Sequence, residues 1–148
     1  MITNRTLLLT GHILAAVLFL GPFTVAASAF PRHARRAHDD NQAHGAVREA
    51  HRISRSYGTN SLAVPALGIA LAADGDWWTQ TWLQVAIALT IGWVVAFFAA
   101  VLPTQRRVLD SLDDACAVDE QLARLHLFAG IHALLWTATL ALMVIKPW

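Results

Sequence analysis

Four long stretches of the chain carry no Asp, Glu, Lys or Arg, and they dominate its pattern of polar and apolar positions. They cover residues 6–30, 56–73, 77–105 and 125–145. Each is long enough to cross roughly 30 Å of hydrocarbon at 1.5 Å per residue, although the second only just reaches this length. Because a backbone in lipid must satisfy its own hydrogen bonds, we predict membrane-spanning helices at about 6–30, 56–73, 78–102 and 125–145.

The connections between these spans are short, which favours helices that alternate in direction. We therefore predict an all-α integral membrane four-helix bundle in up-down-up-down order, forming a single transmembrane domain over residues 1–148. The connecting segments 31–55 and 103–124 should be partly helical, because their apolar residues recur at helical spacing. Pro22 and Pro65 should kink or locally open their helices. Small residues four positions apart would allow close helix contacts at Gly11 and Ala15, Gly68 and Ala72, Ala96 and Ala100, and Ala129 and Ala133.

The composition agrees with a membrane protein and excludes several other classes. Of the 148 residues, 56% are hydrophobic and 14% are charged, whereas soluble domains average about 45–50% and 25%. Such a hydrophobic chain is not disordered, and the single cysteine, Cys116, excludes a disulfide scaffold. The net charge of +1 argues against nucleic acid as a partner. Ala27-Ser28-Ala29 resembles a signal-peptide cleavage site, but the apolar run before it is too long, so we expect a retained span.

The basic residues predict the orientation in the membrane. Of the 11 Lys and Arg residues, only Arg5 and Lys146 lie outside the two connecting segments. Basic loops stay in the cytoplasm, so we expect both segments there and both termini outside, in a bacterial inner membrane. An aromatic belt should then lie near the outer face, formed by Trp77, Trp78, Trp82 and Trp148.

The first connecting segment contains a basic amphipathic helix. Its apolar stripe includes Ala43, Val47 and Ala50, and the other face carries Arg48, Arg52 and Arg55. We weigh three interpretations. The helix lies on the membrane surface and its arginines contact anionic lipid headgroups, it extends the second span into the cytoplasm, or it docks onto a protein partner.

Two histidines are the titratable residues that remain inside the predicted spans, because no full charge lies deep in any of them. An intramembrane ionisable residue is a functional-site hypothesis by default, so His12 and His132 are the candidate cofactor-binding residues. His12 is also the candidate metal ligand, with Met1 and Met143 expected on the same side of the membrane. By helical rise His12 lies about 9 Å and His132 about 20 Å from the outer surface, a difference awkward for one haem iron. The alternative is that both histidines are neutral and make interhelical hydrogen bonds.

Local motifs also suggest a family. The first span reads Thr10-Gly11-His12-Ile13-Leu14-Ala15, Pro65 lies within the second span, and the chain ends with Met143-Val144-Ile145-Lys146-Pro147. Over nearly its whole length the chain resembles a family of predicted bacterial four-span integral membrane proteins of unknown function. That family is distantly similar to copper-resistance protein D and to the small membrane-type protoporphyrinogen oxidase.

The resemblance implies that His12 is the family-level candidate for a haem or metal ligand. The oxidase-type relatives pair such a histidine with a lysine in a later span, and this chain has only Lys146, at the expected outer end. We therefore do not expect the oxidase activity. We expect no other enzyme activity either, because the sequence offers no deep nucleophile beside a base, no paired carboxylates and no glycine-rich phosphate loop. We predict an accessory or binding protein that acts through its helix faces and basic loop, in contact with lipid and with other membrane proteins or a second copy of itself. The alternative is a haem- or copper-binding redox or transport protein that uses His12.

Overall fold

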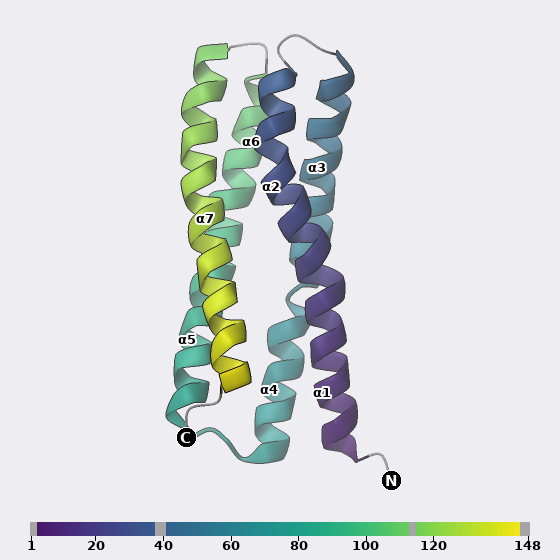
Figure 1. Ribbon diagram of the computed structural model, residues 1–148, viewed down its shortest axis with the longest axis vertical. Coiled ribbons are helices and arrows are strands. Elements are labelled where there is room, and N and C mark those ends of the chain that lie inside the picture. The colour runs from purple at the N-terminus through teal and green to yellow at the C-terminus, as the bar shows by residue number, and fades with distance from the viewer. Residues whose placement is uncertain (1–2, 38–40, 113–114, 146–148) are drawn as a thin grey trace.

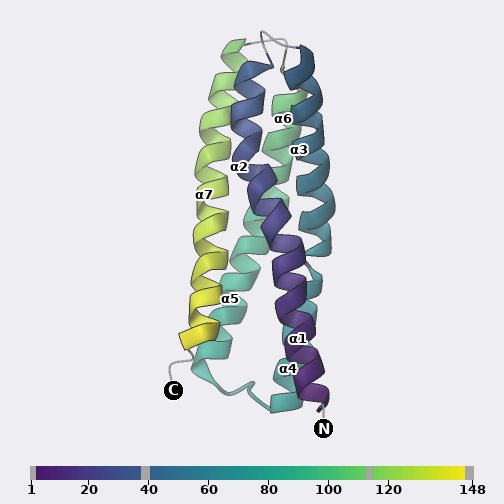
Figure 2. The same cartoon turned by 45° about the vertical axis from the view of Figure 1, so that its right-hand side comes forward.

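The protein is an elongated bundle of antiparallel helices (Figures 1 and 2). The computed structural model describes residues 3–37, 41–112 and 115–145, with side chains for all of these except 41, 42 and 115–117. Met1, Lys146, Trp148 and the side chain of Cys116 therefore lie outside the described part of the chain. The described chain is almost entirely helical, which confirms the predicted all-α bundle.

The first and third helical rods are each interrupted by a wide π-helical turn. The first rod comprises α1 (Asn4–Ala15), η1 (Ala16–Leu20) and α2 (Gly21–Arg36). The third comprises α5 (Thr81–Val95), η2 (Ala96–Val101) and α6 (Leu102–Asp110). Both π turns come just before a proline, Pro22 or Pro103. A proline lacks the amide hydrogen and collides with the carbonyl four residues earlier, and the wider turn avoids this collision.

The second rod is broken within the span predicted at 56–73, where the sequence predicted that Pro65 kinks or locally opens the helix. Here α3 (Asn41–Asn60) ends, residues 61–62 form a turn, and α4 (Ala63–Gly75) follows. The amide of Val64 bonds to the carbonyl of Ser61, a three-residue step at 2.9 Å. The physical reason is Pro65, which can neither donate to the Ser61 carbonyl nor fit beside it in an α-helix.

The fourth rod is the single helix α7 (Ala115–Ile145). Within the described residues, three helices are long and apolar enough to cross a membrane, at Asn4–Arg36, Thr81–Asp110 and Val118–Ile145. The broken second rod is not among them, so the fourth span stays a prediction.

The two ends of the bundle are packed differently. Asn4 and Ile145 lie at one end, the terminal end, and the C-terminal ends of α2 and α6 lie at the other, the arginine-rich end (Figures 1 and 2). At the arginine-rich end α2, α3, α6 and α7 pack into a closed ring around one apolar core. Its most enclosed side chains include Phe23, Phe30, Phe97, Val108 and Leu122. At the terminal end α1 packs against α4, and α5 packs against α7.

The basic amphipathic helix of the sequence is α3, and its apolar stripe faces the bundle. Ala43, Val47 and Ala50 are buried in the core against α2. Arg48, Arg52 and Arg55 are exposed on the other face. The stripe needed for insertion into a leaflet is therefore already covered, and α3 packs as part of the second rod. Contact of the arginines with anionic headgroups stays a prediction.

Candidate functional site: an apolar cavity between two helix pairs

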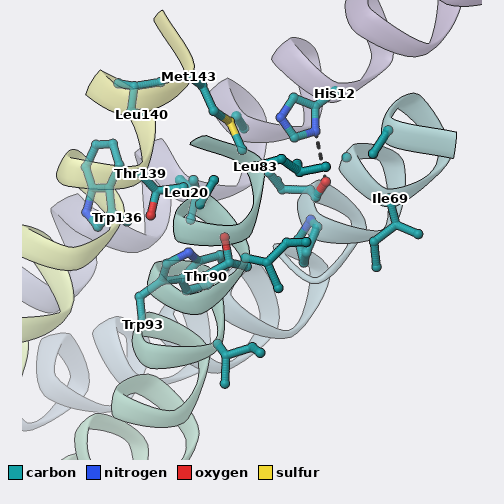
Figure 3. A pocket seen from close by; sticks show the side chains of 18 of the residues that line it. His12, Leu20, Ile69, Leu83, Thr90, Trp93, Trp136, Thr139, Leu140 and Met143 are labelled. Atoms are coloured by element: carbon teal, nitrogen blue, oxygen red, sulfur yellow. Dashed lines mark hydrogen bonds between the residues drawn. The ribbon is translucent and has the colours of Figure 1, made fainter. Parts of the chain in front are cut away.

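A cavity of about 650 Å³ separates the pair α1 and α4 from the pair α5 and α7 at the terminal end. Its walls are almost entirely apolar, and Figure 3 shows the side chains that surround it. Val17, Ile69 and Ile91 line it and are also more than half exposed on the bundle surface. The cavity therefore opens at helix faces that lipid would contact in a membrane.

His12 projects from α1 into this cavity and is only 9% exposed. Its Nδ1 donates a hydrogen bond to the backbone carbonyl of Val64 on α4, at 2.9 Å (Figure 3). Gly68, one turn further along α4, supplies the space for the ring, because a β-carbon there would lie 3.2 Å from Cε1 of His12. The sequence carried a weak signal for this contact in the small-residue pair Gly68 and Ala72.

Three tryptophans shape the cavity walls. Trp93 of α5, Trp136 of α7 and Trp78 in the turn before α5 all line it. The turn that carries Trp78 is held by its neighbour Trp77, whose ring lies 4.6 Å from the guanidinium carbon of Arg5, a cation–π contact to α1. The sequence pattern placed Trp77 and Trp78 at one membrane face, but it gave no indication that Trp93 and Trp136 border a cavity.

Polar groups on the cavity wall are few. Besides His12, the hydroxyl-bearing residues are Thr90 on α5 and Thr139 on α7 (Figure 3). Thr139 donates its hydroxyl to the carbonyl of Leu135 within its own helix, at 2.9 Å. Met143 also lines the cavity, so one thioether shares this space with His12.

His132 does not line this cavity. Its Nδ1 donates to the carbonyl of Trp93 at 3.1 Å, and it is 3% exposed. The rings of Phe23, Trp93 and Phe97 enclose it, with centroids 4.8, 5.7 and 5.8 Å away. His132 instead borders a separate void of about 20 Å³ beside Trp136. The structure thus does not bring His12 and His132 to one cavity, which agrees with the difference in depth estimated from the sequence.

No group of three or more His, Cys, Asp or Glu side chains within the described residues is arranged to hold a metal ion. His12 and Met143 are the pair of conventional soft or borderline donors that share the large cavity.

The arginines proposed for the membrane surface lie at the opposite end of the molecule from the cavity. Arg52 donates to Glu49 on the same helix at 2.9 Å, and this hydrogen bond raises the pKa of the Arg52 guanidinium above its usual value. Arg48, Arg52 and Arg55 are exposed on the face of α3 opposite its buried stripe.

The comparison with known protein families agrees with this description. Residues 6–147 match the family described as "Predicted integral membrane protein (DUF2269)". The chain belongs to this family. It is therefore an integral membrane protein that contacts lipid through its apolar helices. No curated protein and no solved structure matches the chain.

Proposed function

We propose that this DUF2269 membrane protein binds an apolar small molecule in the cavity between its two helix pairs, as a binding or accessory protein and not as an enzyme. The cavity volume of about 650 Å³ carries the proposal. Small-molecule sites in proteins are typically apolar pockets of roughly 300–1,000 Å³ with a few polar groups, and this cavity has that size and character.

The packing of the rest of the molecule supports the proposal. At the arginine-rich end Phe30, Val47, Val101 and Leu122 are essentially inaccessible, so the chain fills its interior closely there. The four rods can thus pack without a large void, as they do in this half. The cavity is confined to the terminal end, as expected for a binding site.

Filling the cavity tests the proposal. The protein is purified in mild detergent, and the molecules that accompany it are extracted and identified by mass spectrometry. Thr90→Trp places an indole in the cavity, and we expect it to reduce the bound molecule by roughly fivefold to a hundredfold, because overpacking costs about 1–3 kcal/mol.

The matched control is Ala88→Trp, which adds the same indole to an exposed position of α5 outside the cavity lining. It should retain the bound molecule. Equal retention by both variants, or the recovery of bulk lipid alone from the wild type, would contradict the proposal.

A second candidate function is haem or copper binding at His12. The family resemblance seen in the sequence also implies such a ligand at His12. Metal-ligating histidines commonly donate the other ring nitrogen to a backbone carbonyl, as His12 does to Val64. Met143 supplies a soft donor in the same cavity. A Soret band in the purified protein that disappears in His12→Ala, or stoichiometric copper by metal analysis, would establish this function in place of the first.

We further propose that the protein lies in a bacterial inner membrane with both termini outside, so that the cavity faces the outer leaflet. The distribution of the arginines supports this orientation. In that orientation α3 and α6 form the cytoplasmic end, where Arg48, Arg52 and Arg55 are available to anionic headgroups, another membrane protein or a second copy of the chain.

A further inference from the structure

Of the two ring nitrogens of His12, Nδ1 makes a hydrogen bond and Nε2 makes none within the described residues. Nδ1 must carry the proton, because its partner is the Val64 carbonyl, which can only accept. In the neutral ring Nε2 is then a hydrogen-bond acceptor. Nε2 makes no hydrogen bond with any residue that the structure describes, although the side chain is more than nine-tenths buried.

The surroundings hold this nitrogen in a fixed position. The bond to Val64 fixes one edge of the ring, and the space beside Cε1 is so narrow that a β-carbon added at Gly68 would lie 3.2 Å from it, so rotation of the ring would break the bond to Val64. In Figure 3 the second ring nitrogen of His12 points away from the dashed hydrogen bond. The cavity thus contains the unpaired acceptor Nε2 of His12 in largely apolar surroundings. The other polar groups of its lining are the hydroxyls of Thr90 and Thr139 and the indole N–H of Trp136, which is buried and has no hydrogen-bond partner among the described residues.

From this geometry we infer that the ligand of the cavity is a hydrophobic molecule with one hydrogen-bond donor, a hydroxyl, which donates to Nε2 of His12. An unpaired polar atom in an apolar site is costly, and a ligand that supplies the missing donor removes that cost. A ligand that offers only an acceptor, such as an ether, leaves Nε2 unpaired. The tryptophan walls at positions 78, 93 and 136 favour a hydroxyl carried on a flat ring, that is, a phenol. The inference rests on the proposed function and specifies the ligand.

Two probes that differ only in the donor test the inference. 4-Nonylphenol and its methyl ether, 4-nonylanisole, are titrated into the purified wild-type protein, and binding is followed by quenching of tryptophan fluorescence. We expect the phenol to bind roughly threefold to tenfold more tightly than the ether, as one net hydrogen bond predicts. A spectrum recorded before titration verifies that no haem is present.

Two variants identify the acceptor. His12→Phe keeps a ring but removes both nitrogens, and we expect the two probes to bind it equally. His12→Asn retains a short N–H that can reach the Val64 carbonyl and lacks an acceptor at the Nε2 position, so it provides the same test if the phenylalanine variant does not fold. A ¹⁵N resonance of Nε2 with an unprotonated shift, which moves on addition of the phenol alone, is a second readout.

The outcomes separate the inference from the proposed function. Equal binding of both probes to the wild type, or an unchanged preference for the phenol in both variants, overturns the inference and leaves the binding cavity standing. The absence of binding by either probe, together with the absence of any co-purifying apolar molecule, overturns both. Haem or copper on Nε2 also overturns the inference, because the metal would occupy the lone pair.

Discussion

At the residue scale, a single glycine can permit a close contact between two helices. Gly58 on α3 lies directly beneath the ring of Phe97, where an added β-carbon would lie 2.1 Å from the nearest ring carbon. Gly45, on the same helix, has no atom within 4 Å of the corresponding position. The two glycines thus share a helix but differ completely in what they touch.

We therefore expect opposite effects from the same substitution. Gly58→Ala should lower the free energy of unfolding by about 1–3 kcal/mol, because the β-carbon displaces the buried Phe97 ring. Gly45→Ala should raise it by up to about 1 kcal/mol, because alanine is the better helix former and meets no obstacle. Thermal unfolding in detergent measures both. A Gly58→Ala protein as stable as the wild type would show that Phe97 moves aside at no cost.

A buried polar cluster provides a second contact at this scale, between α3 and α6. Gln105 accepts from Nδ1 of His51 at 3.1 Å and donates to the hydroxyl of Ser54 at 3.2 Å. Gln105 and Ser54 are fully buried. Gln105→Ala should lower the free energy of unfolding by about 1–3 kcal/mol, since it leaves a cavity and an unpaired hydroxyl, whereas Gln80→Ala in the exposed turn before α5 should have little effect. Equal thermal unfolding of these two variants would contradict this role for Gln105.

At the scale of the helices, the position of each proline determines where a rod is widened or broken. Pro22 and Pro103 each follow a π turn and leave the rod continuous, whereas Pro65 follows a break at Ser61 and Leu62. The break allows α4 to change course, so that α3 packs on α2 and α4 packs on α1. It also brings the Val64 carbonyl to His12.

Replacing this proline should restore a regular helix. In Pro65→Ala we expect the new amide at position 65 to bond to the Ser61 carbonyl and to become protected from hydrogen exchange. The amide of Ala66, which bonds to Leu62 at 3.2 Å in the wild type, serves as an internal reference. Rapid exchange at position 65, with Ala66 still protected, would mean that tertiary packing imposes the break and not the proline.

At the scale of the whole molecule, one half is closed and the other is open. Around the arginine-rich end the four rods form a ring with a continuous apolar core. Around the terminal end they divide into two pairs with the cavity between them. Phenylalanines occupy the centre of the closed half, whereas the helix faces that border the open space include the small residues Gly68, Ala72 and Ala86.

The orientation of the whole molecule can be tested with an impermeant maleimide on intact cells. Cys116→Ser gives a cysteine-free background, into which Thr79→Cys or Gly45→Cys is introduced. Both positions are exposed, at opposite ends of the bundle. The positive-inside rule predicts that only Thr79→Cys is labelled before the cells are permeabilised.

Labelling of Gly45→Cys alone before permeabilisation would mean that both termini lie in the cytoplasm. Labelling of both cysteines from outside would mean that the broken rod α3 and α4 does not cross the membrane, and that the number of crossings is three. Each result therefore identifies one arrangement of the rods.

The sequence by itself determined the class of this protein, because charge-free stretches are a property of composition that needs no tertiary contacts. It also identified the helical stripe of α3, the effect of Pro65 on the second rod, and His12 as a residue to examine. These are local properties, set by spacing along the chain.

Only the tertiary structure decided how those parts meet. It placed Gly68 beside His12, put His12 and His132 at different voids, and used the stripe of α3 for packing within the bundle. It also left open the space in which His12 presents one free nitrogen. The physical reason is that a cavity depends on which side chains fail to fill the space between helices distant in the sequence, and no periodicity along one helix contains that information.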